Sequence, residues 1–113
     1  MASEKIYMPD YDETALEFVR RVVREQPDRE PLHILELLTE IVFDELRDQP
    51  YDISAEASAL RTTLKVRHHG RPIDERTVRI MLKFTDRVDY MQDGDAWVLT
   101  IRRDIPPLIA TRR

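Results

Sequence analysis

A helical spacing of apolar residues marks the first part of the chain. Four apolar residues between positions 10 and 25 recur at intervals of three or four, which places them on one side of an α-helix. These residues are Leu16, Val19, Val22 and Val23. Asp10 or Asp12 can cap the first turn, because a short carboxylate accepts hydrogen bonds from the free N–H groups there. The pattern predicts an amphipathic helix that ends near Glu25, after a short strand over residues 5–8.

The next segment, residues 31–48, is apolar on more than one face. Its apolar residues stand at positions 32, 34, 35, 37, 38, 41, 42, 43 and 46. Pro31 suits the first position of a helix, where its missing N–H costs nothing. The segment is therefore expected to form the central helix of the fold. Its polar residues Glu36, Glu40 and Asp44 recur at four-residue spacing and would form an acidic ridge if that side of the helix is open.

Residues 55–68 are compatible with two structures. Ser54 is a candidate N-cap for a helix from Ala55 to Leu64, in which alanine and leucine favour the helical state. The alternative is a strand over residues 62–68. In that strand one face would carry Thr62, Leu64 and Val66, and the other would carry Thr63, Lys65 and Arg67.

A helix and a hairpin are predicted for the remainder of the chain. After a turn at residues 70–72, Asp74 is a candidate N-cap for a helix through about Arg87. Its inner side would hold Val78, Leu82 and Thr85, and its outer side Arg76, Arg79, Lys83 and Arg87. Strand-like runs at 88–91 and 97–101 then flank Asp93-Gly94, a dipeptide that tolerates the positive φ angles of a tight hairpin turn.

The order of these elements from residue 32 onward resembles the winged helix-turn-helix domains of bacterial and archaeal transcription regulators. The run from Ile73 to Lys83 is similar to a recognition helix of the S-x-R-T-V-R-x-x-L-K kind, and residues 88–101 are similar to the wing that follows. The resemblance implies a mainly helical α+β fold, a winged helix-turn-helix with an added N-terminal helix and a C-terminal β-hairpin wing. The expected parts are an N-terminal strand and helix extension (1–30), a winged helix domain (31–105) and a basic tail (106–113).

A row of cations on the predicted recognition helix gives the candidate site. Arg76, Arg79 and Lys83 lie at three- and four-residue spacing, so they share one helix face that could follow the major groove of double-stranded DNA. Arg76 is nearest the helix start and is the candidate for base contact. The candidates for phosphate contact are Thr77, Arg79 and Lys83, together with Arg71 in the preceding turn.

Charge is divided unevenly between the two halves of the chain. The net charge of −4 combines a first part, residues 1–60, with 6 Lys and Arg against 15 Asp and Glu, and a second part, residues 61–113, with 12 against 7. Such asymmetry favours a nucleic-acid surface in the second part. Winged helices also serve as protein-interaction modules, so an alternative function is protein binding with the acidic first part as the docking surface. The N-terminal helix is a candidate homodimer contact, because DNA operators commonly pair two half-sites.

Several classes of chemistry have no support in the sequence. The chain has no cysteine, and Gly70 and Gly94 are its only glycines, too few for a phosphate-binding loop. No nucleophile stands in a recognisable motif, so neither an enzyme nor a cofactor is expected. His68 and His69 would point to opposite faces of a strand without a third ligand nearby, so we expect a polar loop rather than a metal site. No apolar run approaches membrane-spanning length and no signal peptide is evident, so the expected location is the cytoplasm.

Part of the chain also resembles the GHKL-type anti-sigma-factor kinases. The similar features are a strand at 5–8, two helices, Leu37-Leu38-Thr39-Glu40 in the second helix, and Asp86 to Tyr90 before a final strand. Asp44 stands where that family places its magnesium-binding Asn, and the glycine-rich ATP lid is missing. The resemblance thus implies a non-catalytic, protein-binding regulatory module without ATP binding. It requires residues 62–70 to form a strand in a sheet.

Overall fold

Five strands and three α-helices make up residues 4–105, the part of the chain that the computed structural model describes. The strands are β1 (Lys5–Tyr7), β2 (Tyr51–Ala57), β3 (Arg61–His69), β4 (Arg87–Asp93) and β5 (Ala96–Asp104). The helices are α1 (Ala15–Arg24), α2 (His33–Glu45) and α3 (Glu75–Phe84), and a 3-10 turn (Glu30–Leu32) precedes α2. The predicted basic tail, residues 106–113, lies outside the described residues.

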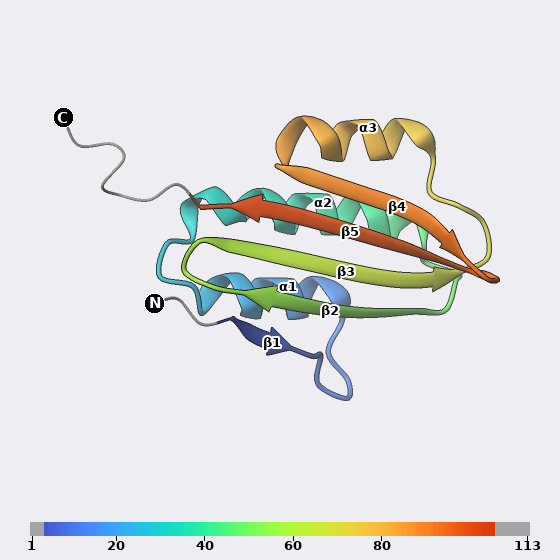
Figure 1. The fold of residues 1–113 in the computed structure, drawn as a ribbon. Helices are drawn as coiled ribbons and strands as arrows, with labels where there is room; N and C mark the ends of the chain where they lie inside the picture. The colour runs from blue at the N-terminus through green and yellow to red at the C-terminus, as the bar shows by residue number, and fades with distance from the viewer. Residues whose placement is uncertain (1–3, 106–113) are drawn as a thin grey trace.

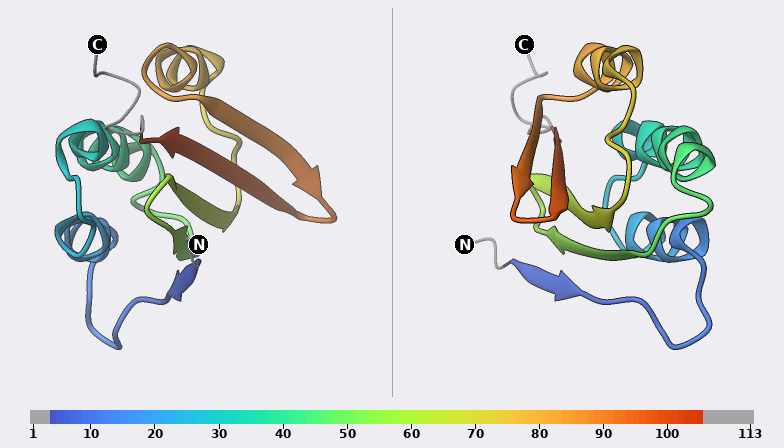
Figure 2. Two further views of the ribbon diagram at one scale, coloured as in Figure 1. Left: turned by 60° about the vertical axis from the view of Figure 1, so that its left-hand side comes forward. Right: turned by 90° about the vertical axis from the view of Figure 1, so that its right-hand side faces the viewer.

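The strands form one antiparallel sheet in the order β1-β2-β3-β5-β4. The helices α1 and α2 pack side by side against one face of this sheet, and α3 lies at its β4 end (Figure 1). The turned views show that the opposite face of the sheet carries no helix (Figure 2). The hydrophobic core therefore lies between the sheet and one layer of helices.

This architecture is a sheet-rich α+β fold, with about 35% helix and 34% strand, so the expected mainly helical winged helix-turn-helix is wrong. The predicted hairpin exists, but it does not project as a wing. Its second strand, β5, pairs with β3 from Arg61↔Asp104 to His69↔Ala96, which places the hairpin inside the sheet. The N-terminal residues are part of the same sheet, because β1 pairs with β2.

A hairpin of β2 and β3 occupies the segment for which a helix from Ala55 to Leu64 was one expectation. Across its two-residue turn the Ser58 N–H donates to the Arg61 carbonyl at 2.9 Å. Along β3 the side chains that face the helices are buried, namely Thr62, Leu64, Val66 and His68. The strand alternative for 62–68 is confirmed, because strand pairing and alternate burial outweigh the helix preference of alanine and leucine.

Thr14, rather than Asp10 or Asp12, caps α1. Its hydroxyl accepts a hydrogen bond from the Glu17 N–H at 3.1 Å, and the Glu17 carboxylate accepts one from the Thr14 N–H at 2.9 Å. The predicted capping role of the two aspartates is wrong, since both precede the cap in the loop.

The apolar face predicted for α1 is largely confirmed. Its buried valines are Val19, Val22 and Val23, joined by Ala15 and Phe18, whereas Leu16 is half-buried. The residues that this helix exposes are charged: Glu17, Arg20 and Arg24. A homodimer through α1 stays a prediction, and it would have to use this charged surface.

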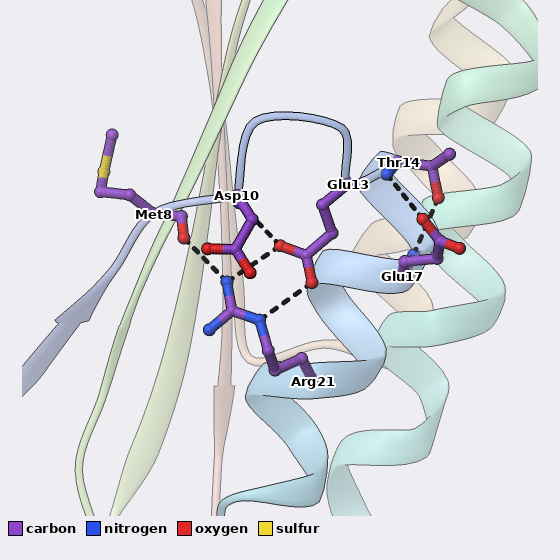
Figure 3. A network of polar contacts seen from close by, with 6 residues as sticks. All are labelled: Met8, Asp10, Glu13, Thr14, Glu17 and Arg21. Atoms are coloured by element: carbon purple, nitrogen blue, oxygen red, sulfur yellow. Dashed lines mark hydrogen bonds and ion pairs between the residues drawn. The ribbon is translucent and has the colours of Figure 1, made fainter.

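Arg21 joins the end of β1 to the start of α1 (Figure 3). Its Nε and Nη2 atoms each donate to the Glu13 carboxylate at 2.9 Å, and Nη2 also donates to the Met8 carbonyl at 2.8 Å. The Arg21 guanidinium holds the pKa of the Glu13 carboxyl below its ordinary value. The loop between strand and helix is thus held by a charge-assisted pair.

The final hairpin turns at Gly94 and Asp95, since Asp93 pairs with Ala96. Gly94 has a φ of +66°, a left-handed conformation that glycine adopts without a steric penalty. The hairpin prediction is confirmed, with the turn one residue later than Asp93-Gly94.

Replacing Thr14 with Ala should lower the free energy of unfolding by about 1 kcal/mol, because α1 loses its side-chain cap. Urea unfolding measures this change. Asp12→Ala is the control and should change the same quantity by less than about 0.5 kcal/mol. A larger loss in Asp12→Ala than in Thr14→Ala would contradict the assigned cap.

Candidate functional site

The helix α3 exposes most of the predicted DNA-contact residues. The side chains of Arg76 and Arg79 are 84% and 67% exposed, and Lys83 and Arg71 are also exposed. Arg76 pairs with Asp74 at 3.1 Å, and Arg79 pairs with Glu75 at 2.6 Å. Lys83 takes part in no ion pair with another residue of the described range 4–105. The helix thus presents the predicted cationic row, with its two arginines already paired to carboxylates.

Thr77 lies on the opposite, buried side of α3. It is 7% exposed, and its hydroxyl donates to the Glu45 carboxylate at the end of α2. The same carboxylate accepts a hydrogen bond from the Asp74 N–H at 2.9 Å. The structure therefore does not bring Thr77 together with Arg76, Arg79 and Lys83. Its contact joins α3 to α2 instead.

Carboxylates of the chain itself occupy the N-terminus of α3. The Asp74 side chain accepts a hydrogen bond from the Arg76 N–H at 2.8 Å, and the Glu45 carboxylate accepts one from the Asp74 N–H. Hydrogen bonds from the Arg76 side chain and backbone hold the pKa of Asp74 below its ordinary value. A helix N-terminus attracts anions through its free N–H groups and its dipole. In this structure the carboxylates of Asp74 and Glu45 already occupy the place that such an anion would take.

An open hollow lies beside this helix start. It is lined by Asp44, Glu45, Arg47, Asp48, Gln49, Arg71, Pro72 and Asp74. Four of these residues are acidic and two are arginines. The hollow is thus net acidic, and it repels rather than attracts a polyphosphate.

A buried histidine joins three parts of the chain beside the hollow. His68 is fully buried in β3, with Nδ1 3.0 Å from the Gln49 Oε1 and Nε2 2.9 Å from the Tyr90 hydroxyl. The Tyr90 oxygen also accepts the Ile73 N–H at 2.8 Å. These partners fit a neutral His68 in which Nδ1 carries the proton and Tyr90 donates to Nε2. The network fixes the segment before α3 to the sheet.

Burial lowers the pKa of the His68 imidazole, because desolvation disfavours its charged form. The expectation that His68 and His69 form a polar loop is wrong. Their opposite orientation on a strand is confirmed, since His69 is only half-buried. Continuing the alternation of Leu64 and Val66 by one step would have placed His68 in the core. Within residues 4–105, no group of three or more His, Asp or Glu residues is arranged to hold a metal ion.

The buried side of α3 also differs from the prediction. Thr77 and Met81 are its buried residues, whereas Leu82, expected inside, is 53% exposed. Ile80 and Phe84 are 39% and 49% exposed. The helix α3 lies at the margin of the helix layer, beside the edge strand β4 (Figure 2). The sheet and the other helices therefore cover less of α3 than they would cover of a helix in the middle of the layer. Sequence reasoning missed this apolar surface because it assumed a helix packed inside a helical domain.

Comparison with known proteins gives no family assignment. No protein-family model matches the chain, and no curated protein is similar to it in sequence. None of the helices within residues 4–105 has both the length and the apolarity needed to cross a membrane.

Protonation of His68 should destabilise the fold in mild acid. Because the folded-state pKa lies below that of the unfolded chain, the unfolded state takes up a proton first as the pH falls below about 6.5. The free energy of unfolding should therefore be lower at pH 5.5 than at pH 7.5. His68→Gln should remove most of this difference in urea titrations, and His69→Gln should keep it. A wild-type stability that does not change over this interval would contradict the assigned neutral histidine.

Proposed function

We propose that this chain is a non-catalytic regulatory module that binds another protein through α3. The observation that carries the proposal is the exposure of two large apolar side chains, Ile80 and Phe84, which lie four residues apart on one side of a ten-residue helix. Contiguous exposed apolar surface on a small domain is typical of a protein interface. The flanking lysine and arginines give this surface a polar rim.

The order of elements supports the same proposal. The resemblance to GHKL-type anti-sigma-factor kinases required a strand over residues 62–70, and β3 covers Arg61–His69 within the sheet. An N-terminal strand and two helices precede it and a final strand follows it, as that resemblance implies. This similarity concerns only the order of the helices and strands. The function has to be argued from the residues of the site.

The residues do not fit the nucleotide that this resemblance would bring. Asp44 replaces the magnesium-binding Asn, and the hollow beside it is net acidic. The carboxylates of Glu45 and Asp74 take the N–H groups at the start of α3, where a phosphate would otherwise bind. We therefore propose protein binding without nucleotide chemistry.

Binding of double-stranded DNA by α3 stays a prediction with weaker support. Arg76, Arg79 and Lys83 are exposed along the helix, as that function requires. However, Asp74 and Glu75 neutralise two of the three cations, and Thr77 is buried against α2. Phosphate contacts need cations that are free to displace counterions.

Capture from an extract of the native host distinguishes the two functions. The immobilised wild-type chain should retain a protein after nuclease treatment, and Ile80→Asp/Phe84→Asp should lose it because a buried charge at an interface is strongly unfavourable. Met91→Asp, at a 61% exposed site on β4, is the matched control and should retain it.

Duplex DNA in gel shifts at low salt provides the opposing measurement. The proposal predicts no shift that depends on the α3 cations. A salt-dependent shift abolished by Arg76→Ala and Lys83→Ala, together with capture that nuclease removes, would instead assign DNA binding.

A further inference from the structure

The contact of Glu45 with α3 defines which sides of two helices face each other. The helices α2 and α3 run in opposite directions, and the end of α2 meets the start of α3 (Figure 1). Residues three, four or seven apart share a helix face. Going back from Glu45 along α2, the same side therefore carries Ile41, Leu37 and Ile34. Going forward from Thr77 along α3, it carries Ile80 and Phe84.

By this helical geometry the two rows lie along the shared margin of α2 and α3, and we name them the α2–α3 patch. Its members are Ile34, Leu37 and Ile41 of α2 and Ile80 and Phe84 of α3. Leu37 is 52% exposed, whereas Ile34 and Ile41 pack in part against the core. Two antiparallel helices with apolar residues along their shared margin provide a surface on which a third helix can pack.

Charges of opposite sign border the patch. Along its outer side on α3, Lys83 lies three residues after Ile80, and Arg76, which pairs with Asp74 at 3.1 Å, lies four residues before it. Along its outer side on α2, Glu40 lies three residues after Leu37, and Asp44, which pairs with Arg47 at 3.7 Å, lies seven residues after it. All four of these border residues are exposed. The charge that is in no ion pair within residues 4–105 is Lys83 on one rim and Glu40 on the other, so the two rims differ in sign.

We propose that the α2–α3 patch binds an amphipathic helix of a partner protein, with carboxylates along one edge of its apolar stripe and cations along the other. This inference rests on the proposed function and names the chemistry of the partner. The carboxylate edge faces Arg76 and Lys83, and the cationic edge faces Glu40 and Asp44. Complementary rims fix the direction of the bound helix, since reversing it would bring like charges together.

Three synthetic helical peptides of equal length test the charge pattern. All carry the same leucine stripe, with Glu on one edge and Lys on the other, Glu on both edges, or Lys on both edges. The mixed peptide should bind the full chain about tenfold more tightly than either of the others at low salt. Amide chemical-shift changes should map its binding to α2 and α3.

Variants of the protein sharpen the test. Ile80→Asp should abolish binding of the mixed peptide, whereas Met91→Asp, outside the patch, should leave it unchanged. The double substitution Arg76→Glu/Lys83→Glu makes both rims acidic, so the preference should shift to the peptide with Lys on both edges. Circular dichroism checks that each variant keeps the wild-type fold.

Other outcomes overturn the inference in distinguishable ways. Equal binding of the three peptides, binding that maps elsewhere, or no binding at all rules out the oriented helix. If the host protein is still captured but does not respond to Leu37→Asp, protein binding survives and binding at the α2–α3 patch does not. A concentration-dependent dimer that Ile80→Asp dissolves would assign the patch to a second copy of this chain.

Discussion

The carboxylate of Glu45 fixes the position of α3 in this structure. It is the last residue of α2, and it accepts hydrogen bonds from the Asp74 N–H and the Thr77 hydroxyl in the first turn of α3. An ionised acceptor makes such bonds stronger than neutral ones. The same contact aligns the apolar rows of the two helices and fills the site where a helix start would attract an anion. Both the proposed binding surface and the poor fit to a nucleotide follow from it.

The division of charge along the chain acquires a different meaning in the folded molecule. Its acidic first part supplies Glu40 and Asp44, and its basic second part supplies Arg76 and Lys83. In the proposed α2–α3 patch these groups lie on two sides of one apolar surface. A division that suggested a nucleic-acid surface therefore also fits two rims of a protein interface. The rims define orientation, and the apolar side chains between them provide the area to be buried.

The local sequence pattern was sufficient to predict α1 and the final hairpin. The spacing of Val19, Val22 and Val23 predicted α1, and Gly94 marked the final hairpin within one residue. The segment 55–68 remained open, because alanine and leucine favour a helix while the alternation up to Val66 favours a strand. Only pairing with neighbouring strands decides between them, and that is a long-range property.

The candidate site was predicted in part. The cationic row on α3 was placed correctly on an exposed face, but Thr77 was not, since its hydroxyl meets a carboxylate 32 residues away in the chain. His68 looked like a loop residue because a histidine pair carries no apolar signal. The exposure of Ile80 and Phe84 depends on the position of α3 at the margin of the helix layer, which the helix's own sequence does not encode.

Amide hydrogen exchange in the variant Glu45→Ala tests the central claim most directly, with Asp44→Ala as the matched control. Without the Glu45 carboxylate, the amides of α3 from Thr77 to Met81 should exchange at least about tenfold faster, while those of α1 keep their wild-type rates. Asp44→Ala should leave both helices unchanged. Wild-type exchange rates throughout α3 in Glu45→Ala would contradict the account.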